Sequence, residues 1–140
     1  MSILDRYQAY ADAFEQTYVD DDWSRIEPFF TEDAVYEGAP EDAAGRDAVI
    51  AKLRASVNAF DRRMDRRTPD FQTPTVEGDT LTMEWAVTYE KAGCPDLVIS
   101  GREIAVFEGE RIARLRGDFD PAAEKALGEW MAAHGAKLAG

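Results

Sequence analysis

Leu81-Thr82-Met83-Glu84-Trp85-Ala86-Val87-Thr88-Tyr89-Glu90 is the stretch that decides the fold of this chain. Large apolar side chains alternate in it with polar or small ones, a period of two that is typical of a half-buried β-strand. Turn tripeptides, Glu77-Gly78-Asp79 and Glu108-Gly109-Glu110, punctuate the sequence around it. The pattern predicts a meander of strands over about 70–77, 80–91, 97–108 and 111–119, with an earlier short strand at 34–37.

The N-terminal part of the chain has a period of three to four residues, which is typical of helices. It predicts one long helix, then a short one with Asp22 as its N-cap and Pro28 confining it to a turn or two. A third helix is expected from about Asp47, and a last one after Asp120, its predicted cap, with Pro121 at its first position. The long helix places on one face Ile3, Tyr7, Tyr10, Phe14 and Tyr18.

Helices followed by a run of strands favour an α+β domain, with the helices packed on one face of an antiparallel sheet. The chain has 140 residues, with 45% hydrophobic and 31% charged ones, which are the proportions of a globular protein. No internal repeat, linker or low-complexity tract divides it. We therefore expect a single domain over residues 1–140.

Charge and cysteine content limit the partners and the compartment. The net charge of −12 disfavours nucleic acid and anionic membrane surfaces, since both carry phosphate. Cys94 is the single cysteine and the N-terminal residues lack the apolar run of a signal peptide, so we expect a cytoplasmic protein. His134 is the single histidine, which excludes histidine triads and multi-histidine metal sites. No metal and no cofactor is predicted.

Three stretches resemble a known family. The residues from Asp22 to Glu37 resemble the signature of the nuclear-transport-factor-2-like (NTF2-like) superfamily, whose SnoaL-like branch is related to ketosteroid isomerases and polyketide cyclases. Gly45-Arg46-Asp47-Ala48-Val49 resembles the start of that family's third helix, and Phe107-Glu108-Gly109-Glu110-Arg111-Ile112 its last hairpin. The resemblance implies a cystatin-like cone: three N-terminal helices on a curved, mostly antiparallel sheet, plus a C-terminal helix, around an apolar pocket.

The resemblance also implies positions for catalytic groups. In the ketosteroid-isomerase branch the general base would fall at Gly38 and an oxyanion-binding tyrosine at Phe14, so both groups are absent here. The second oxyanion donor of that branch, a carboxylic acid kept neutral, falls at Glu103. The polyketide-cyclase branch uses an aspartate near the end of the last strand, where Asp118 and Asp120 lie, and Asp120 is better explained as a helix cap.

Glu103 also stands out from the strand pattern alone. It shares one strand face with Phe107, whereas Ile104 and Val106 are on the other face. If the first face lines the pocket, Glu103 is a carboxyl group among aromatic rings, and desolvation raises its pKa into a range suited to acid/base catalysis. The alternative is that Ile104 and Val106 face the core and Glu103 lies in solvent.

The remaining candidate residues divide into two groups. Tyr18 and Asp118 are predicted to assist Glu103 in catalysis. The basic pairs Arg62-Arg63 and Arg66-Arg67 have anion binding as one interpretation, but amid so many acids the favoured one is that they balance neighbouring charges. His134 is interpreted as packing with its helix on the rim of the sheet. The predicted ligand-binding residues, each of which has plain core packing as its alternative, are Tyr10, Phe14, Trp85, Tyr89 and Phe107.

Two functions stay open at this point. One is an enzyme that binds a small apolar molecule and catalyses cofactor-free proton transfer, as in an isomerase, dehydratase or cyclase. The other is a ligand-binding or protein-interaction module without chemistry. In either case the resemblance implies a homodimer through the outer face of the sheet, which is expected to present Arg102, Ile104, Val106, Ile112 and Arg114.

Overall fold

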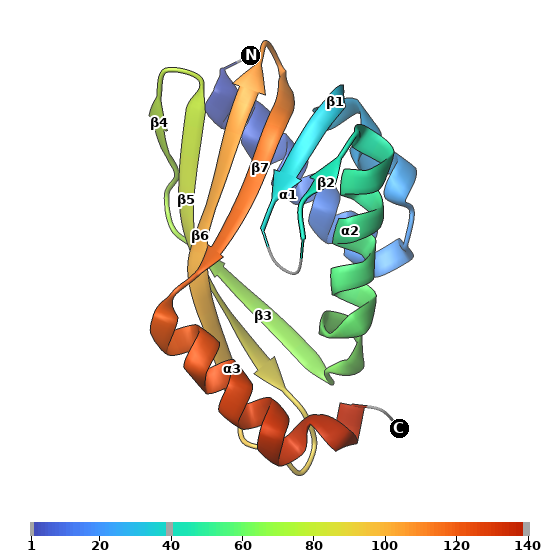
Figure 1. The fold of residues 1–140 in the computed structure, drawn as a ribbon, viewed down its shortest axis with the longest axis vertical. Coiled ribbons are helices and arrows are strands. Elements are labelled where there is room, and N and C mark those ends of the chain that lie inside the picture. Colours follow the sequence, from blue (N-terminus) through green and yellow to red (C-terminus); the bar gives the residue numbers. More distant parts are fainter. Residues whose placement is uncertain (1, 39–40, 139–140) are drawn as a thin grey trace.

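The computed structural model describes residues 2–38 and 41–138 of the chain (Figure 1). The α-helices in this part of the chain are α1 (Ile3–Asp20), α2 (Arg46–Ala59) and α3 (Pro121–His134). The strands are β1 (Phe30–Glu37), β2 (Ala43–Ala44), β3 (Arg66–Phe71), β4 (Thr75–Glu77), β5 (Thr80–Glu90), β6 (Leu97–Glu108) and β7 (Arg111–Phe119). Short 3₁₀ helices are η1 (Trp23–Phe29), η2 (Asp61–Arg63) and η3 (Gly135–Leu138).

The strands form one curved, mixed sheet in the order β2-β1-β7-β6-β5-β3, with β4 paired to β5 beyond the end of β3. The predicted meander matches β5, β6 and β7 to within a residue at each end. Parallel pairing occurs between β1 and β7, so the sheet is not antiparallel throughout. The single strand expected at 70–77 is wrong, because Pro74 has no N–H for the ladder and the segment divides into β3 and β4.

The expectation of three N-terminal helices is met only in part. The chain leaves α1 through Asp21, which has a left-handed φ of 62°. The next segment contains Pro28 and forms the 3₁₀ helix η1 instead of an α-helix. The Asp22 carboxylate does not cap η1; it accepts a hydrogen bond from Ser24.

The helix α3 begins at the predicted residue, but the side chain of its N-cap residue makes a different hydrogen bond from the one expected. Asp120 is the N-cap residue and Pro121 follows it, yet the Asp120 carboxylate makes no capping bond. It accepts a hydrogen bond from the Ser100 hydroxyl at 2.7 Å instead. The side chain therefore ties the start of α3 to β6, which positions the helix against the sheet.

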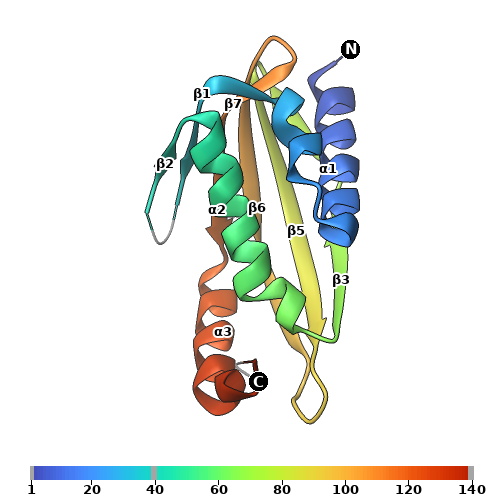
Figure 2. The ribbon, with the colours of Figure 1, turned by 90° about the vertical axis from the view of Figure 1, so that its right-hand side faces the viewer.

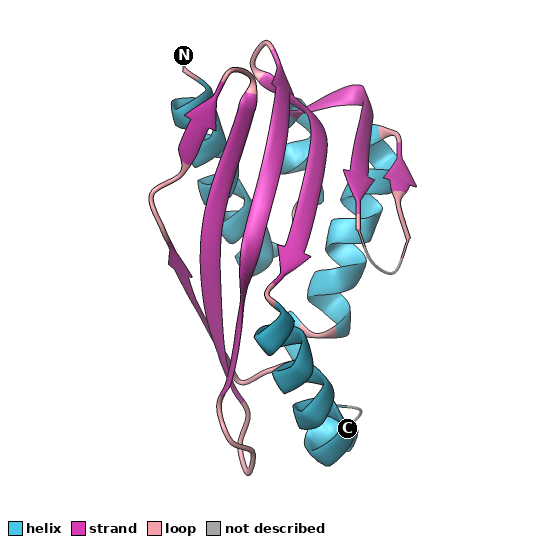
Figure 3. Cartoon of the chain, turned by 60° about the vertical axis from the view of Figure 1, so that its left-hand side comes forward, coloured by secondary structure: helices cyan, strands magenta, loops and turns pink. Residues whose placement is uncertain are grey.

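The helices cover one face of the sheet, here called the inner face. Figure 2 shows α1 and α2 in front of the long strands, with α3 against their lower part, and Figure 3 shows the opposite, outer face. Buried side chains form two clusters on the inner face. The first lies under α1, η1 and α2 and includes Tyr7, Tyr10, Phe30, Leu81 and Phe107. The second lies under α3 and includes Val87, Tyr89, Ile99 and Trp130.

One residue expected on the outer face lies on the inner face. The pairing of β6 with β7 shifts register between Val106 and Phe107, so that Phe107 pairs with Ile112. This bulge turns Ile112 inward, where it is fully buried in the first cluster. Ile104 and Val106 are half-buried on the outer face, and Arg102 and Arg114 are exposed there.

No helix within the described residues combines the length and the apolar character that crossing a bilayer requires.

Candidate functional site

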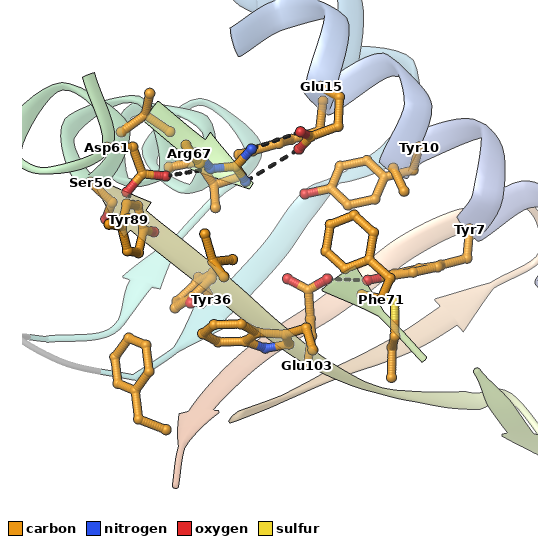
Figure 4. A pocket seen from close by; sticks show the side chains of 18 residues that line it. Tyr7, Tyr10, Glu15, Tyr36, Ser56, Asp61, Arg67, Phe71, Tyr89 and Glu103 are labelled. Carbon is orange, nitrogen blue, oxygen red and sulfur yellow. Dashed lines mark hydrogen bonds and ion pairs between the residues drawn. The ribbon is translucent and has the colours of Figure 1, made fainter. Parts of the chain in front are cut away.

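A cavity of about 250 Å³ lies on the inner face of the sheet (Figure 4). Its aromatic lining consists of Tyr7, Tyr10, Phe14, Tyr36, Phe71, Trp85, Tyr89 and Phe119. Its charged lining consists of Glu15, Asp61, Arg67 and Glu103. Since Phe71 and Phe119 are 42% and 45% exposed, the cavity opens to solvent beside them. Its walls are thus mostly apolar, with a few polar groups, as is typical of sites for small organic molecules.

Strand register places an aromatic row across the cavity. Phe71, Trp85, Gly101 and Phe119 pair in succession across β3, β5, β6 and β7. The rings of Trp85 and Phe119 meet edge to face, with 5.8 Å between their centroids. Gly101 between them has no room for a side chain, because a Cβ atom would lie 2.2 Å from the carbonyl oxygen of Asp118. Glycine there allows both a close approach of β6 to β7 and the contact between the rings.

Glu103 lies on the inner face of β6, so its side chain lines the cavity, and the alternative with Glu103 in solvent does not apply. Its carboxylate accepts a hydrogen bond from the Tyr7 hydroxyl of α1 (Figure 4). Burial raises the pKa of the Glu103 carboxyl, and the hydrogen bond from Tyr7 opposes that shift. The structure places no cation against this carboxyl among the described residues. The group therefore retains its proton to a higher pH than an exposed glutamic acid does.

Two further tyrosines surround this carboxyl. Burial, followed by the negative charge of Glu103, raises the pKa of both Tyr10 and Tyr36, and that of Tyr36 reaches about 12. Neither hydroxyl has a hydrogen-bond partner within the described residues, although Tyr10 is only 3% exposed. Both hydroxyls are therefore free to donate to a ligand oxygen.

The residue opposite Glu103 makes room for one of these tyrosines. Glu103 pairs with Gly117 of β7, and a Cβ atom on Gly117 would lie 2.8 Å from the Tyr36 hydroxyl oxygen. A larger residue there would displace the ring of Tyr36. We call Glu103 with Tyr7, Tyr10 and Tyr36 the Glu103 end of the cavity.

The other end contains an arginine between two carboxylates. The Arg67 guanidinium donates from Nε to Asp61 at 3.1 Å, and from Nη1 and Nη2 to the two oxygens of Glu15 at 2.7 and 3.3 Å. The Tyr89 hydroxyl donates to the second Asp61 oxygen at 3.1 Å. Burial raises the pKa of Asp61 even though Arg67 and Tyr89 act in the opposite direction. We call Asp61, Arg67, Glu15, Tyr89 and the neighbouring Ser56 the Asp61 end.

Two predicted catalytic assistants do not lie with Glu103. The Tyr18 hydroxyl donates to the backbone oxygen of Asp61 at 3.2 Å, and Tyr18 is not part of the cavity lining. Asp118 points outward, since Gly117 and Phe119 occupy the inward positions of β7, and it pairs with Arg116 at 3.0 Å. The prediction that they assist Glu103 therefore does not fit the structure.

The predicted ligand-binding set is gathered almost entirely in the cavity. Tyr10, Phe14, Trp85 and Tyr89 line it, whereas Phe107 is 2% exposed and packs in the first cluster. Whether any of these residues contacts a ligand stays a prediction. His134 lies on α3 with its ring 5.5 Å from that of Trp130, away from the cavity lining.

Sequence reasoning missed several polar groups of the site. The helical spacing predicts Tyr7 only as part of the apolar face of α1, because the partner of its hydroxyl lies 96 residues further along the chain. The sequence offers anion binding or charge balance for Arg67 but does not place it in the cavity, whereas its register opposite Tyr89 brings it to the inner face. Alternation along β3 and β5 could have placed Arg67 inside, had the pairing been known.

Known proteins share this fold. An NTF2-like protein of unknown function from Exiguobacterium superimposes with a TM-score of 0.65 at 21% identity, covering 86% of this chain and 99% of its own. A candidate SnoaL-like polyketide cyclase from Shewanella denitrificans reaches 0.64 at 14% identity, covering 90% and 96%. TerC, co-crystallised with polyporic acid, reaches 0.61 at 13% identity, covering 86% and 98%. At these identities the likeness concerns the fold.

No curated protein matches this chain. Among the described residues, no group of three or more His, Cys, Asp or Glu side chains is arranged to hold a metal ion. The model of one family, the SnoaL-like domain, matches residues 7–115. That match covers most of α1 and most of the sheet, so the chain belongs to the SnoaL-like family, a branch of the NTF2-like superfamily.

Proposed function

We propose that this protein binds a small apolar molecule in its cavity and that Glu103 catalyses cofactor-free proton transfer on it, as an isomerase or lyase does. One observation carries the proposal: a carboxyl group with a raised pKa lines an aromatic cavity, with a tyrosine hydroxyl as its partner in place of a cation. A carboxyl group with a raised pKa can both accept a proton from a ligand and return it.

The neighbouring groups support a specific sequence of steps. The ionised Glu103 carboxylate removes a proton from a carbon atom next to a carbonyl group of the ligand. The electron pair of that C–H bond moves toward the carbonyl oxygen, which gains negative charge. Unpartnered hydroxyls of Tyr10 and Tyr36 donate hydrogen bonds to that oxygen. Glu103 then returns the proton to another atom of the ligand, which completes an isomerisation, or the intermediate expels a leaving group, which completes an elimination.

Two other positions favour a second candidate function, binding without chemistry. The resemblance to ketosteroid isomerases puts catalytic groups at Phe14 and Gly38, and neither residue can transfer a proton. The fold itself accommodates small organic ligands, since the similar protein TerC was co-crystallised with polyporic acid. In that case the ligand leaves the cavity unchanged.

Hydrogen–deuterium exchange separates these functions. The probe is 2-tetralone, an apolar two-ring ketone whose hydrogens next to the carbonyl are weakly acidic. In D₂O, followed by proton NMR, the protein is expected to accelerate the loss of these hydrogens above the buffer rate. The Glu103→Gln variant is expected to return the loss to the buffer rate, because the amide cannot accept the proton.

The matched control is Glu108→Gln, at an exposed position near the end of the same strand. It is expected to keep the acceleration. Full acceleration by Glu103→Gln would remove Glu103 from the mechanism. Saturable binding of 2-tetralone without exchange would favour the non-catalytic function.

We also propose that the protein forms a homodimer through the outer face of the sheet. Ile104 and Val106 lie half-buried there, and Val98 is 53% exposed on the same face. A second copy would cover these side chains. Analytical ultracentrifugation is expected to show a dimer that Val106→Asp dissociates, and a monomer at all concentrations would contradict the proposal.

We also propose a cytoplasmic location, from the state of the single cysteine. Cys94 is a free, half-buried thiol, which suits a reducing compartment. Fractionation of cells that express the protein is expected to recover it with the cytoplasmic fraction.

A further inference from the structure

The lining of the cavity contains more acidic than basic side chains. Glu15, Asp61 and Glu103 contribute three carboxyl groups, and Arg67 contributes the single cation of the lining. Arg67 is already engaged, since its Nε, Nη1 and Nη2 atoms all donate to Asp61 or Glu15. Its side chain is only 9% exposed and its guanidinium lies 5.0 Å from the centroid of the Tyr18 ring. It therefore has little capacity to hold a further anion.

The nearby cations do not correct this imbalance. Arg62 donates to the Tyr18 backbone oxygen at 3.1 Å and pairs with Asp21 at 3.1 Å. Lys52 donates to the backbone oxygens of Gly38 and Glu41. Neither Arg62 nor Lys52 is part of the cavity lining. The chain as a whole has a net charge of −12, so its long-range field has the same sign as the cavity.

Two consequences follow for a ligand. An anionic group in the cavity would be desolvated beside carboxylates, at a cost that the engaged Arg67 does not offset. A cationic group would find surplus carboxylate charge and the faces of aromatic rings, which attract cations. Tyr10 lines the cavity and is only 3% exposed as a residue, and its hydroxyl, which has no partner among the described residues, offers a further acceptor (Figure 4).

We propose that the natural ligand is a protonated apolar amine, whose ammonium group lies at the Asp61 end beside Asp61, Ser56 and Tyr89 and whose apolar body lies on the rings of Trp85, Phe71 and Phe119. This inference rests on the proposed ligand-binding function and specifies its ligand class. It leaves Glu103 itself free for proton transfer. Asp61 and Glu103 lie at different places in the cavity, because Asp61 accepts a hydrogen bond from Tyr89, whereas Glu103 pairs with Met83, six positions earlier on β5 (Figure 4).

Three probes with one skeleton test the charge preference: 2-aminotetralin, 2-tetralol and tetralin-2-carboxylate. At pH 7 they are cationic, neutral and anionic respectively. Isothermal titration calorimetry is expected to show that the amine binds at least roughly tenfold more tightly than the alcohol, with no detectable binding of the carboxylate. Quenching of tryptophan fluorescence provides an independent readout, since Trp85 lines the cavity.

Asp61→Asn is expected to reduce the affinity of the amine to that of the alcohol and to leave the affinity of the alcohol unchanged. Glu15→Gln, at a side chain that is 34% exposed, provides a second variant with the same expected direction in case the first does not fold. The matched control is Asp70→Asn, which removes one negative charge from an exposed position on the outer face of β3.

The outcomes are distinguishable. Equal or tighter binding of the carboxylate or the alcohol would overturn the amine inference and leave the ligand-binding function in place. An equal loss of amine affinity in Asp70→Asn would overturn the assignment of the ammonium group to the Asp61 end. If none of the probes bound at millimolar concentration, the ligand-binding function would itself be contradicted, and the inference with it.

Discussion

Both ends of the cavity hold a carboxyl group whose pKa is raised by burial, but only the Asp61 end supplies a cation. Asp61 receives hydrogen bonds from Arg67 and Tyr89, and Glu15 completes the ion-pair network. Glu103 receives one from Tyr7, a neutral donor. At both ends burial outweighs the hydrogen-bond donors, but the donors at the Asp61 end include the charged Arg67, whereas the donor at the Glu103 end is the neutral Tyr7. The difference teaches that an ion-pair network stabilises the Asp61 end, whereas the carboxyl group of the Glu103 end has no cation against it among the described residues.

The largest expected effect comes from removing the cation of the Asp61 end. Arg67→Met leaves Asp61 and Glu15 without a counterion, and we expect the free energy of unfolding to fall by about 3–5 kcal/mol in urea denaturation at pH 7. The loss is expected to shrink at acidic pH, where Asp61, whose pKa is raised, takes up a proton. Arg66→Met is the control, since its side chain is 73% exposed, and a change of at most about 0.5 kcal/mol is expected there. Equal losses in the free energy of unfolding for the two variants would show that the ion pairs of Arg67 stabilise the protein no more than an exposed ion pair does.

At the Glu103 end we expect a smaller change, which is a gain in the free energy of unfolding. The folded-state pKa of Glu103 is raised, so its contribution to stability is complete below the unfolded value near 4.5 and is lost as pH rises through the folded value. Glu103→Gln is therefore expected to match the wild type near pH 4 and to be more stable at pH 8, by about 1 kcal/mol.

Urea denaturation across this pH range measures the difference, with Glu108→Gln expected to show no pH-dependent gain because it is exposed. A Glu103→Gln variant that is less stable than the wild type at pH 8 would mean that the carboxylate has a stabilising partner after all.

The smallest expected effect concerns the pKa of Glu103 itself. Tyr7→Phe removes the hydrogen bond that favours the charged form, so the pKa of Glu103 is expected to rise further. Carbon-13 NMR of the glutamate side-chain carboxyl measures this shift, and the pH profile of 2-tetralone exchange should move upward with it. Tyr18→Phe serves as the control, because the Tyr18 hydroxyl bonds to the Asp61 backbone and not to Glu103. An unchanged pKa in Tyr7→Phe would show that Tyr7 does not set the proton affinity of this end.

Much of the fold could be predicted, because the spacing of apolar side chains within one segment indicates whether that segment is a helix or a strand. Alternation in β5 and β6 identified the strands and placed Glu103 and Phe107 on one face. Features that depend on a single backbone interruption could not be predicted from periodicity. Pro74 divides one expected strand into two, and the bulge after Val106 turns Ile112 from the outer to the inner face.

The sequence by itself determined the α+β class and the face of β6 that carries Glu103, since both follow from the spacing of side chains within single segments. Only the tertiary structure decided which polar groups meet. Tyr7 reaches Glu103 across 96 residues, and Arg67 reaches Glu15 across 52. The physical reason is that periodicity is a property of one helix or strand, whereas the partner of a side-chain tip depends on strand register and on how the helices pack over the sheet.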